Sequence, residues 1–267
     1  MRPDRSRRER RSRRRRWLLG GAVLVLLLPV VVALEIAWVL SRPRLETDPP
    51  FRVDAVVGAD RPGATFELRV LGDSTVAGVG VERAEETLPY QVAELVSERL
   101  GRPVHVVGHG VSGAITADVP GQLEDVPTGG VDAILVEVGS NDVLRRRTLN
   151  EVEDDTERVL DAAFARAPVV VLASAGKLNT PNFLQPLRSI ITSRSTRVRG
   201  RQQLVAERRG AGFVDVAREV APLFERAGDD ANASDRFHPS ALGYRLWAGP
   251  LAEQVVEEVA AERRSAG

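Results

Sequence analysis

The sequence predicts a three-layer α/β domain with a central parallel sheet, preceded by one N-terminal transmembrane helix. From Phe66 onward, short apolar runs alternate with longer segments in which Leu and Val recur at helical spacing. Strands that alternate with helices in this way form a parallel sheet covered on both faces. A long uncharged apolar segment near the N-terminus predicts the helix.

The first 16 residues are strongly basic. They contain ten arginines against Asp4 and Glu9, a charge of about +8, whereas the whole chain has no net charge. The rest of the chain is therefore mildly acidic, which argues against nucleic acid as a partner. Because arginines beside an apolar segment stay on the cytoplasmic side, residues 1–16 are predicted to be a cytoplasmic arm.

Residues 17–40 are predicted to form the transmembrane helix. The run from Trp17 to Leu34 carries no charge, and the apolar pattern resumes after Glu35. A helix of this length spans about 36 Å, enough to cross a hydrocarbon core of about 30 Å. The arginines before it place the rest of the chain outside the cytoplasm. The alternative is a secreted protein whose signal peptide is cleaved, with Val31-Val32-Ala33 as a poor cleavage site.

Residues 41–64 combine several prolines with mixed charges and are predicted to be a linker. The globular domain is predicted at residues 65–262. Its longest helical patterns cover 87–100 and 150–166. The candidate strands are Phe66–Leu71, Val104–Val107, Ala133–Val138, Val169–Ala173 and Gly212–Val216. A sheet of this kind holds its ligand at the carboxyl ends of its strands.

The first candidate catalytic segment, Gly72-Asp73-Ser74, directly follows the strand that begins at Phe66. The glycine permits a tight turn, which presents Ser74 at the carboxyl edge of the sheet. Taken alone, this serine is better explained as a helix N-cap than as a nucleophile.

Two further segments follow the next two strands. Gly108–Ala114 is rich in glycine, which allows backbone N–H groups to point at a ligand. Gly139–Asp142 contains Asn141, whose side-chain amide can donate to a developing oxyanion. Each segment alone is an ordinary turn. In a doubly wound sheet, however, these positions and Ser74 converge on one crevice.

The fourth segment, Asp235–Pro239, lies in the last loop before a C-terminal helical pattern. His238 is one of only three histidines, and histidine is the usual base for a serine nucleophile. Asp235 precedes it by three residues and can accept its Nδ1 proton. Other candidate acids lack this spacing to His238, namely Asp118, Asp229 and Asp230. The four segments together supply a nucleophile, a base, an orienting acid and oxyanion donors.

These segments, in this order, resemble the four sequence blocks of the SGNH (GDSL-type) hydrolases, as in a membrane-anchored bacterial member. The resemblance covers about residues 65–255 and implies a flavodoxin-like sheet and metal-free hydrolysis of esters or thioesters. It implies that Ser74 attacks the acyl carbonyl, that His238 transfers the proton and that Asp235 orients His238.

The same resemblance implies an oxyanion hole made by the backbone amides of Ser74 and Gly113 and the side chain of Asn141. The second block departs from the family pattern, because Gly108 stands where an asparagine often begins it. Gly110 therefore competes with Gly113 as donor, although the spacing of Ser112-Gly113 matches the family better.

Substrate contacts are predicted in two places. Lys177–Arg201 follows the fourth strand, so its Phe183 and Leu184 are expected either in a wall or lid for an acyl chain or in a helix packed on the sheet. His109, beside the glycine-rich loop, is a third candidate contact. His105 lies inside an apolar strand and is predicted to be structural.

The predicted function is a serine esterase or lipase-type hydrolase that forms an acyl-serine intermediate on a small-molecule, lipid or glycan ester. The alternatives are an acyltransferase that uses the same residues on a sugar or lipid acceptor, and a non-catalytic binding domain. No metal or other cofactor is predicted, because the chain lacks cysteine and its histidines are dispersed. The predicted partners are the substrate and the membrane.

Overall fold

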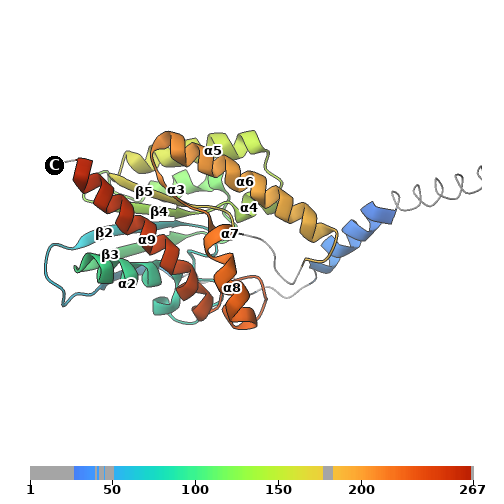
Figure 1. Ribbon diagram of the computed structural model, residues 1–267, viewed down its shortest axis with the longest axis horizontal. Helices are drawn as coiled ribbons and strands as arrows, with labels where there is room; N and C mark the ends of the chain where they lie inside the picture. The colour runs from blue at the N-terminus through green and yellow to red at the C-terminus, as the bar shows by residue number, and fades with distance from the viewer. Residues whose placement is uncertain (1–26, 40, 42–44, 46–50, 177–182, 266–267) are drawn as a thin grey trace, which may run out of the picture.

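The computed structural model describes residues 27–39, 41, 45, 51–176 and 183–265, which contain a six-stranded sheet (Figure 1). Its order is β1-β3-β2-β4-β5-β6. Strands β2 to β6 run parallel, and β1 pairs antiparallel with β3 at one edge. The strands are β1 (Val53–Val57), β2 (Phe66–Gly72), β3 (Val104–Gly110), β4 (Ala133–Glu137), β5 (Val169–Ala173) and β6 (Gly212–Val214).

The five parallel strands begin at the residues that the sequence predicts. Counted in chain order from β2, they lie in the spatial order 2-1-3-4-5, which is the flavodoxin-like arrangement. The predicted α/β fold with a mostly parallel central sheet is therefore confirmed. Strand β1 was not predicted, and the linker assignment of residues 41–64 is wrong for residues 53–57. Val53 and Val57 turn toward the core, whereas Asp54 and Val56 are exposed, as in a one-sided edge strand.

Helices cover both faces of the sheet (Figure 1). The strands, α2 and α9 share one apolar cluster, and α3, α5 and α6 pack in a second cluster on the opposite face. The helices are α2 (Leu88–Leu100), α3 (Val119–Leu123), α4 (Ser140–Leu144), α5 (Leu149–Phe164), α6 (Leu187–Arg209), α7 (Val216–Glu219), α8 (Ala221–Ala227) and α9 (Ala241–Ser265).

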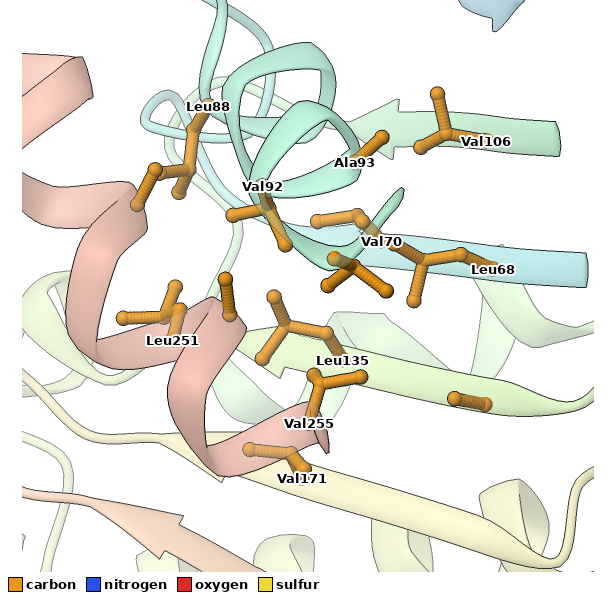
Figure 2. Packing of buried hydrophobic residues seen from close by; sticks show 14 of the residues in the cluster. Leu68, Val70, Leu88, Val92, Ala93, Val106, Leu135, Val171, Leu251 and Val255 are labelled. Carbon is orange, nitrogen blue, oxygen red and sulfur yellow. The ribbon is translucent and has the colours of Figure 1, made fainter. Parts of the chain in front are cut away.

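The core follows the two-residue alternation of the strands. Side chains such as Leu68 and Leu135 point toward Leu251 and Val255 of α9 (Figure 2). The chain neighbours of Leu135, namely Ile134 and Val136, belong to the cluster on the other face. Strands buried on both faces appear in sequence as continuous apolar runs, which explains why they were readily predicted.

The predicted transmembrane helix lies only partly within the described residues. Residues 27–39 are helical, whereas 1–26 and residue 40 lie outside the described part of the chain. No helix in the part that the structure describes combines the length and the apolar character needed to cross a membrane.

Candidate active site

Ser74 lies in a tight turn at the carboxyl end of β2, where its side chain is nearly buried. Gly72 is required by the close approach of β4, because a Cβ at this position would lie 2.0 Å from the carbonyl oxygen of Glu137. Asp73 then stabilises the turn, since its Oδ1 accepts the backbone N–H of Thr75 at 2.9 Å. The turn thus holds Ser74 at the edge predicted from the sequence.

A hydrogen-bonded relay connects Ser74 with two residues that lie more than 160 positions later. Nε2 of His238 is 3.2 Å from Oγ of Ser74. Nδ1 of His238 is 2.7 Å from Oδ2 of Asp235. This geometry suits a serine nucleophile, a histidine base and an acid that fixes the tautomer of the base.

Asp235 is held as a carboxylate by several donors. Its Oδ1 accepts the backbone N–H groups of Phe237 at 2.9 Å and of His238 at 3.0 Å. Burial favours the neutral form, but the hydrogen bonds from the His238 side chain and from these two N–H groups outweigh it and lower the pKa of Asp235 to about 2. Asp235 is therefore ionised at neutral pH and accepts the Nδ1 proton of His238.

Two backbone N–H groups near the nucleophile are available to an oxyanion. In the described part of the chain, neither Ser74 nor Gly113 donates its N–H to another group. Gly113 has a φ of 79°, which glycine adopts without strain. Gly110 has another role, because a Cβ there would lie 2.1 Å from the backbone nitrogen of Ala77. The unengaged N–H of Gly113 is what the predicted donor role requires.

Asn141 lines the same cavity as Ser74, but its amide is already engaged. Nδ2 donates to Oδ2 of Asp73 at 3.1 Å and to the carbonyl oxygen of Ala114 at 3.0 Å. Both amide protons have acceptors in this state, so Asn141 must release one of them before it donates to an oxyanion.

A second acidic residue, Glu137, is fully buried beneath the nucleophile turn. It ends β4 directly opposite Gly72 and faces Asp73. Burial, followed by the charge of Asp73, raises the pKa of Glu137 well above its usual range. Burial also raises the pKa of Asp73, against the lowering effect of the Thr75 hydrogen bonds. Ionisation of Glu137 is therefore disfavoured while Asp73 carries its charge.

Asp142 anchors the loop that carries Gly113. Its Oδ2 accepts both the backbone N–H and the hydroxyl of Thr116 at 2.9 Å. Burial raises the pKa of Asp142 to about 6, despite these hydrogen bonds. Asp142 therefore holds the loop that contains Gly113, and among the described residues it forms no hydrogen bond with Ser74, His238 or Asp235.

A cavity of about 310 Å³ opens over Ser74 and His238. Its wall is largely apolar and comes from α7, α8 and α9, where Phe224 and Trp247 stack edge to face with ring centres 5.9 Å apart. Val216 and Val220 complete the apolar side. This wall was not predicted, because it is built from isolated apolar residues in short helices.

The family assignment now has independent support. Residues 70–246 match the GDSL-like lipase/acylhydrolase family. The chain belongs to this family. A GDSL-like esterase of Mycobacterium tuberculosis is 29% identical over 190 residues, which are 69% of this chain and 60% of that protein. The chain therefore spans less than two thirds of this relative.

Several solved structures of other proteins share the fold of this chain. An acetyl xylan esterase from Geobacillus stearothermophilus is 21% identical and superposes with a TM-score of 0.56 over 71% of this chain and 94% of that chain. An α/β hydrolase from the metagenome of Lake Arreo, Spain, is 19% identical, with a TM-score of 0.59 over 73% and 96%. Catalytic mutants of the xylan esterase replace a serine, a histidine or an aspartate by alanine.

The three predicted substrate contacts do not line the cavity. Phe183 is 3% exposed within an apolar cluster, and Leu184 is exposed at the surface. Both precede α6, which packs on the face of the sheet opposite α9, so residues 187–201 of this segment form a packed helix. Residues 177–182 lie outside the described residues. His109 instead places its Nδ1 3.7 Å from Oδ2 of Asp125.

His105 is structural, as predicted. Its two ring nitrogens each lie 2.8 Å from a carboxylate, Asp54 on β1 and Glu67 on β2. The hydrogen bond with Asp54 is the main cause of a raised His105 pKa, and burial opposes it. The side chain thus joins three neighbouring strands.

Proposed function

We propose that this protein is a serine hydrolase that cleaves carboxylic esters or thioesters through an acyl-serine intermediate. The observation that carries the proposal is the relay from Ser74 through His238 to Asp235, with distances of 3.2 and 2.7 Å. Its position at the carboxyl edge of the sheet, in a GDSL-like family domain, supports the same role.

The reaction proceeds in two halves. Oγ of Ser74 attacks the carbonyl carbon while Nε2 of His238 takes its proton, and the carboxylate of Asp235 stabilises the imidazolium. The carbonyl oxygen becomes an oxyanion that accepts the N–H groups of Ser74 and Gly113. His238 then protonates the departing alcohol or thiol. In the second half His238 deprotonates a water molecule, which attacks the acyl carbon, and the acid leaves as Ser74 regains its proton.

The cavity indicates which part of the substrate binds where. Its apolar wall at Phe224 and Trp247 suits a short acyl group, and its volume of about 310 Å³ is at the lower end for ligand pockets. We therefore place the acyl group against this wall. The substrate class that we propose is an acylated carbohydrate or lipid, consistent with an acetyl xylan esterase among the proteins of this fold.

We further propose that residues 17–40 anchor the protein in a membrane, with residues 1–16 in the cytoplasm and the hydrolase domain outside. The uncharged run after an arginine-rich arm supports this arrangement. Cell fractionation tests it: the full chain should stay in the membrane pellet through alkaline carbonate, and external protease should degrade the hydrolase domain in spheroplasts. Release of the protein into the medium would indicate signal-peptide cleavage instead.

Substitution of the relay tests the activity. We expect Ser74→Ala and His238→Ala to lower kcat for p-nitrophenyl butyrate by at least about 10³-fold, because the nucleophile and its base act as one unit. Ser74→Ala should also abolish labelling by a fluorophosphonate probe. His109→Ala is the matched control and should retain both activities, since His109 does not line the cavity.

Near-native turnover by His238→Ala would contradict the assignment. Product analysis with and without a sugar acceptor distinguishes hydrolysis from acyl transfer, because a transferase forms the acylated sugar in preference to the free acid.

A further inference from the structure

The helix of residues 27–39 is fixed to the hydrolase domain along one face. Val32, Ile36 and Val39 recur at helical spacing and pack against an apolar cluster around Phe183 and Leu187. Between them lies Glu35, which is 8% exposed and accepts the backbone N–H of Leu187 at 3.0 Å. Leu187 begins α6, so Glu35 caps the N-terminal end of that helix. Figure 1 shows the two helix ends side by side.

The rest of the same helix, including its first turn, is largely apolar and exposed. Five of its large residues, together with Leu184 and Ile190 on either side of Leu187, are between 41% and 65% exposed. We name these seven residues the apolar ridge: Leu27, Leu28, Val30, Val31, Leu34, Leu184 and Ile190. An exposed apolar surface of this extent marks an interaction site on a folded protein.

A basic patch borders the ridge. It consists of Arg188, Arg194 and Arg197 in the first turns of α6, and Arg146 just before α5. None of the four pairs with a carboxylate among the described residues. Burial lowers the pKa of Arg194, and the nearby positive charges of Arg197 and Arg146 lower it further.

The rest of α6 differs in this respect. Its later arginines each form an ion pair with Asp or Glu, namely Arg199, Arg201, Arg208 and Arg209. Unpaired positive charge on α6 is therefore concentrated at the end that contacts the helix of residues 27–39. Arg188 and Arg194 donate to backbone carbonyl oxygens, so their charges remain uncompensated by carboxylates of the described residues, and the resulting positive potential at this end suits an anionic partner.

We propose that the apolar ridge and the basic patch dock the hydrolase domain onto an anionic lipid bilayer, with the ridge in the acyl region and the arginines at the phosphates. The sequence favours lipid as the occupant, because the residues that precede Leu27 in the chain, from Trp17 to Leu26, are also uncharged and largely apolar. The helix of residues 27–39 belongs to the segment proposed to span the membrane, so its exposed apolar side chains lie in the acyl region while the arginines of the patch reach the headgroup phosphates.

Docking places the active site near the membrane. The apolar cluster beneath the ridge also includes Phe237, which lines the cavity and lies edge-on to the His238 ring at 5.1 Å. The domain is thus held on the bilayer by the side that carries its catalytic loop. This inference rests on the proposed membrane location but not on the proposed ester hydrolysis.

The chain has no cysteine, so single cysteines can be labelled without background. The full chain is reconstituted in bilayers that contain phosphatidylglycerol and a nitroxide-bearing lipid, with an environment-sensitive fluorophore at Ile190→Cys. We expect strong quenching at this position. Leu204→Cys is the matched control, because Leu204 is 51% exposed on the ion-paired part of α6 and should not be quenched.

Equal quenching of the two labels would overturn the proposal, as would shielding of Ile190 by a second copy without contact with lipid. A label at Val30→Cys separates two ways in which the proposal can fail. Quenching at Val30 but not at Ile190 would show that the N-terminal helix contacts lipid and the hydrolase domain does not, which would refute the docking. Hydrolysis of p-nitrophenyl butyrate, measured on the same samples, reports separately on the proposed activity.

A separate experiment tests whether docking requires the positive charge of the basic patch. The double variant Arg146→Gln and Arg197→Gln, or bilayers of phosphatidylcholine alone, should lower the quenching at Ile190 at least twofold. Arg208→Gln, which removes a paired arginine, should leave it unchanged. If quenching at Ile190 is the same in neutral bilayers and in the double variant as in the wild type on anionic bilayers, the role of the basic patch is refuted.

Discussion

At the scale of single residues, the catalytic loop depends on one unusual backbone conformation. Arg236 has a φ of 55°, which non-glycine residues rarely adopt. The turn around it directs the N–H groups of both Phe237 and His238 onto one oxygen of Asp235. The other oxygen is left for Nδ1 of His238. Local strain at this position is thus linked to the orientation of the base.

The buried pair of Asp73 and Glu137 gives a prediction about pH. A carboxyl group with a raised pKa in the folded state contributes stability fully below its unfolded pKa of about 4.3 and loses it as the pH rises. Glu137→Gln removes this titration and keeps the shape. We therefore expect its Tm to fall less than that of the wild type between pH 5 and pH 8.

Thermal unfolding at a series of pH values measures this difference, which corresponds to at most about 1.4 kcal/mol per pH unit. The exposed Glu262→Gln is the control for the loss of one glutamate and should follow the wild type. A Glu137→Gln profile parallel to that of the wild type would show that Glu137 is ionised in the folded protein.

At the scale of elements, the parallel strands were predicted well and the cavity wall was not. Strands such as β4 and β5 are buried on both faces, so their sequences are uninterrupted apolar runs. Helices α7 and α8 have only 4 and 7 residues, too few for a helical period to emerge. Their apolar residues therefore gave no indication that they face the nucleophile.

The wall formed by α8 and α9 makes a prediction about acyl length. Trp247→Ala removes the indole that packs against Phe224 and enlarges the cavity. We expect kcat/KM to shift by at least about tenfold from acetyl toward hexanoyl and octanoyl esters, because each methylene that gains a buried site adds about 0.8 kcal/mol of binding free energy. Kinetics on p-nitrophenyl esters of increasing chain length measure the shift.

Leu184→Ala serves as the control for this experiment. Its side chain is exposed and does not line the cavity, so the chain-length preference should equal that of the wild type. A longer preferred acyl chain in Leu184→Ala, but not in Trp247→Ala, would move the acyl site to the segment before α6.

At the scale of the whole molecule, sheet topology assembles the site. The segments that contain Ser74, Gly113 and Asn141 follow β2, β3 and β4, which are neighbours in the sheet. This convergence was predictable, because parallel strands all end at one edge. The contribution of β1 was not predictable from the prolines around it. The alternation of only five residues, Val53–Val57, does not stand out from a linker.

Strand β1 leads to a prediction about the boundary of the folding unit. A fragment of residues 65–267 begins at the predicted domain start and lacks β1, whereas a fragment of residues 51–267 retains it. Loss of β1 removes Val53 and Val57 from the core and exposes the edge of β3. At about 1.5–3 kcal/mol for each buried valine, the deletion costs a large share of a typical stability of about 5–15 kcal/mol. We therefore expect the shorter fragment to aggregate or to unfold at a markedly lower urea concentration than the longer fragment. Equal urea midpoints for monomers of both fragments would place β1 outside the folding unit.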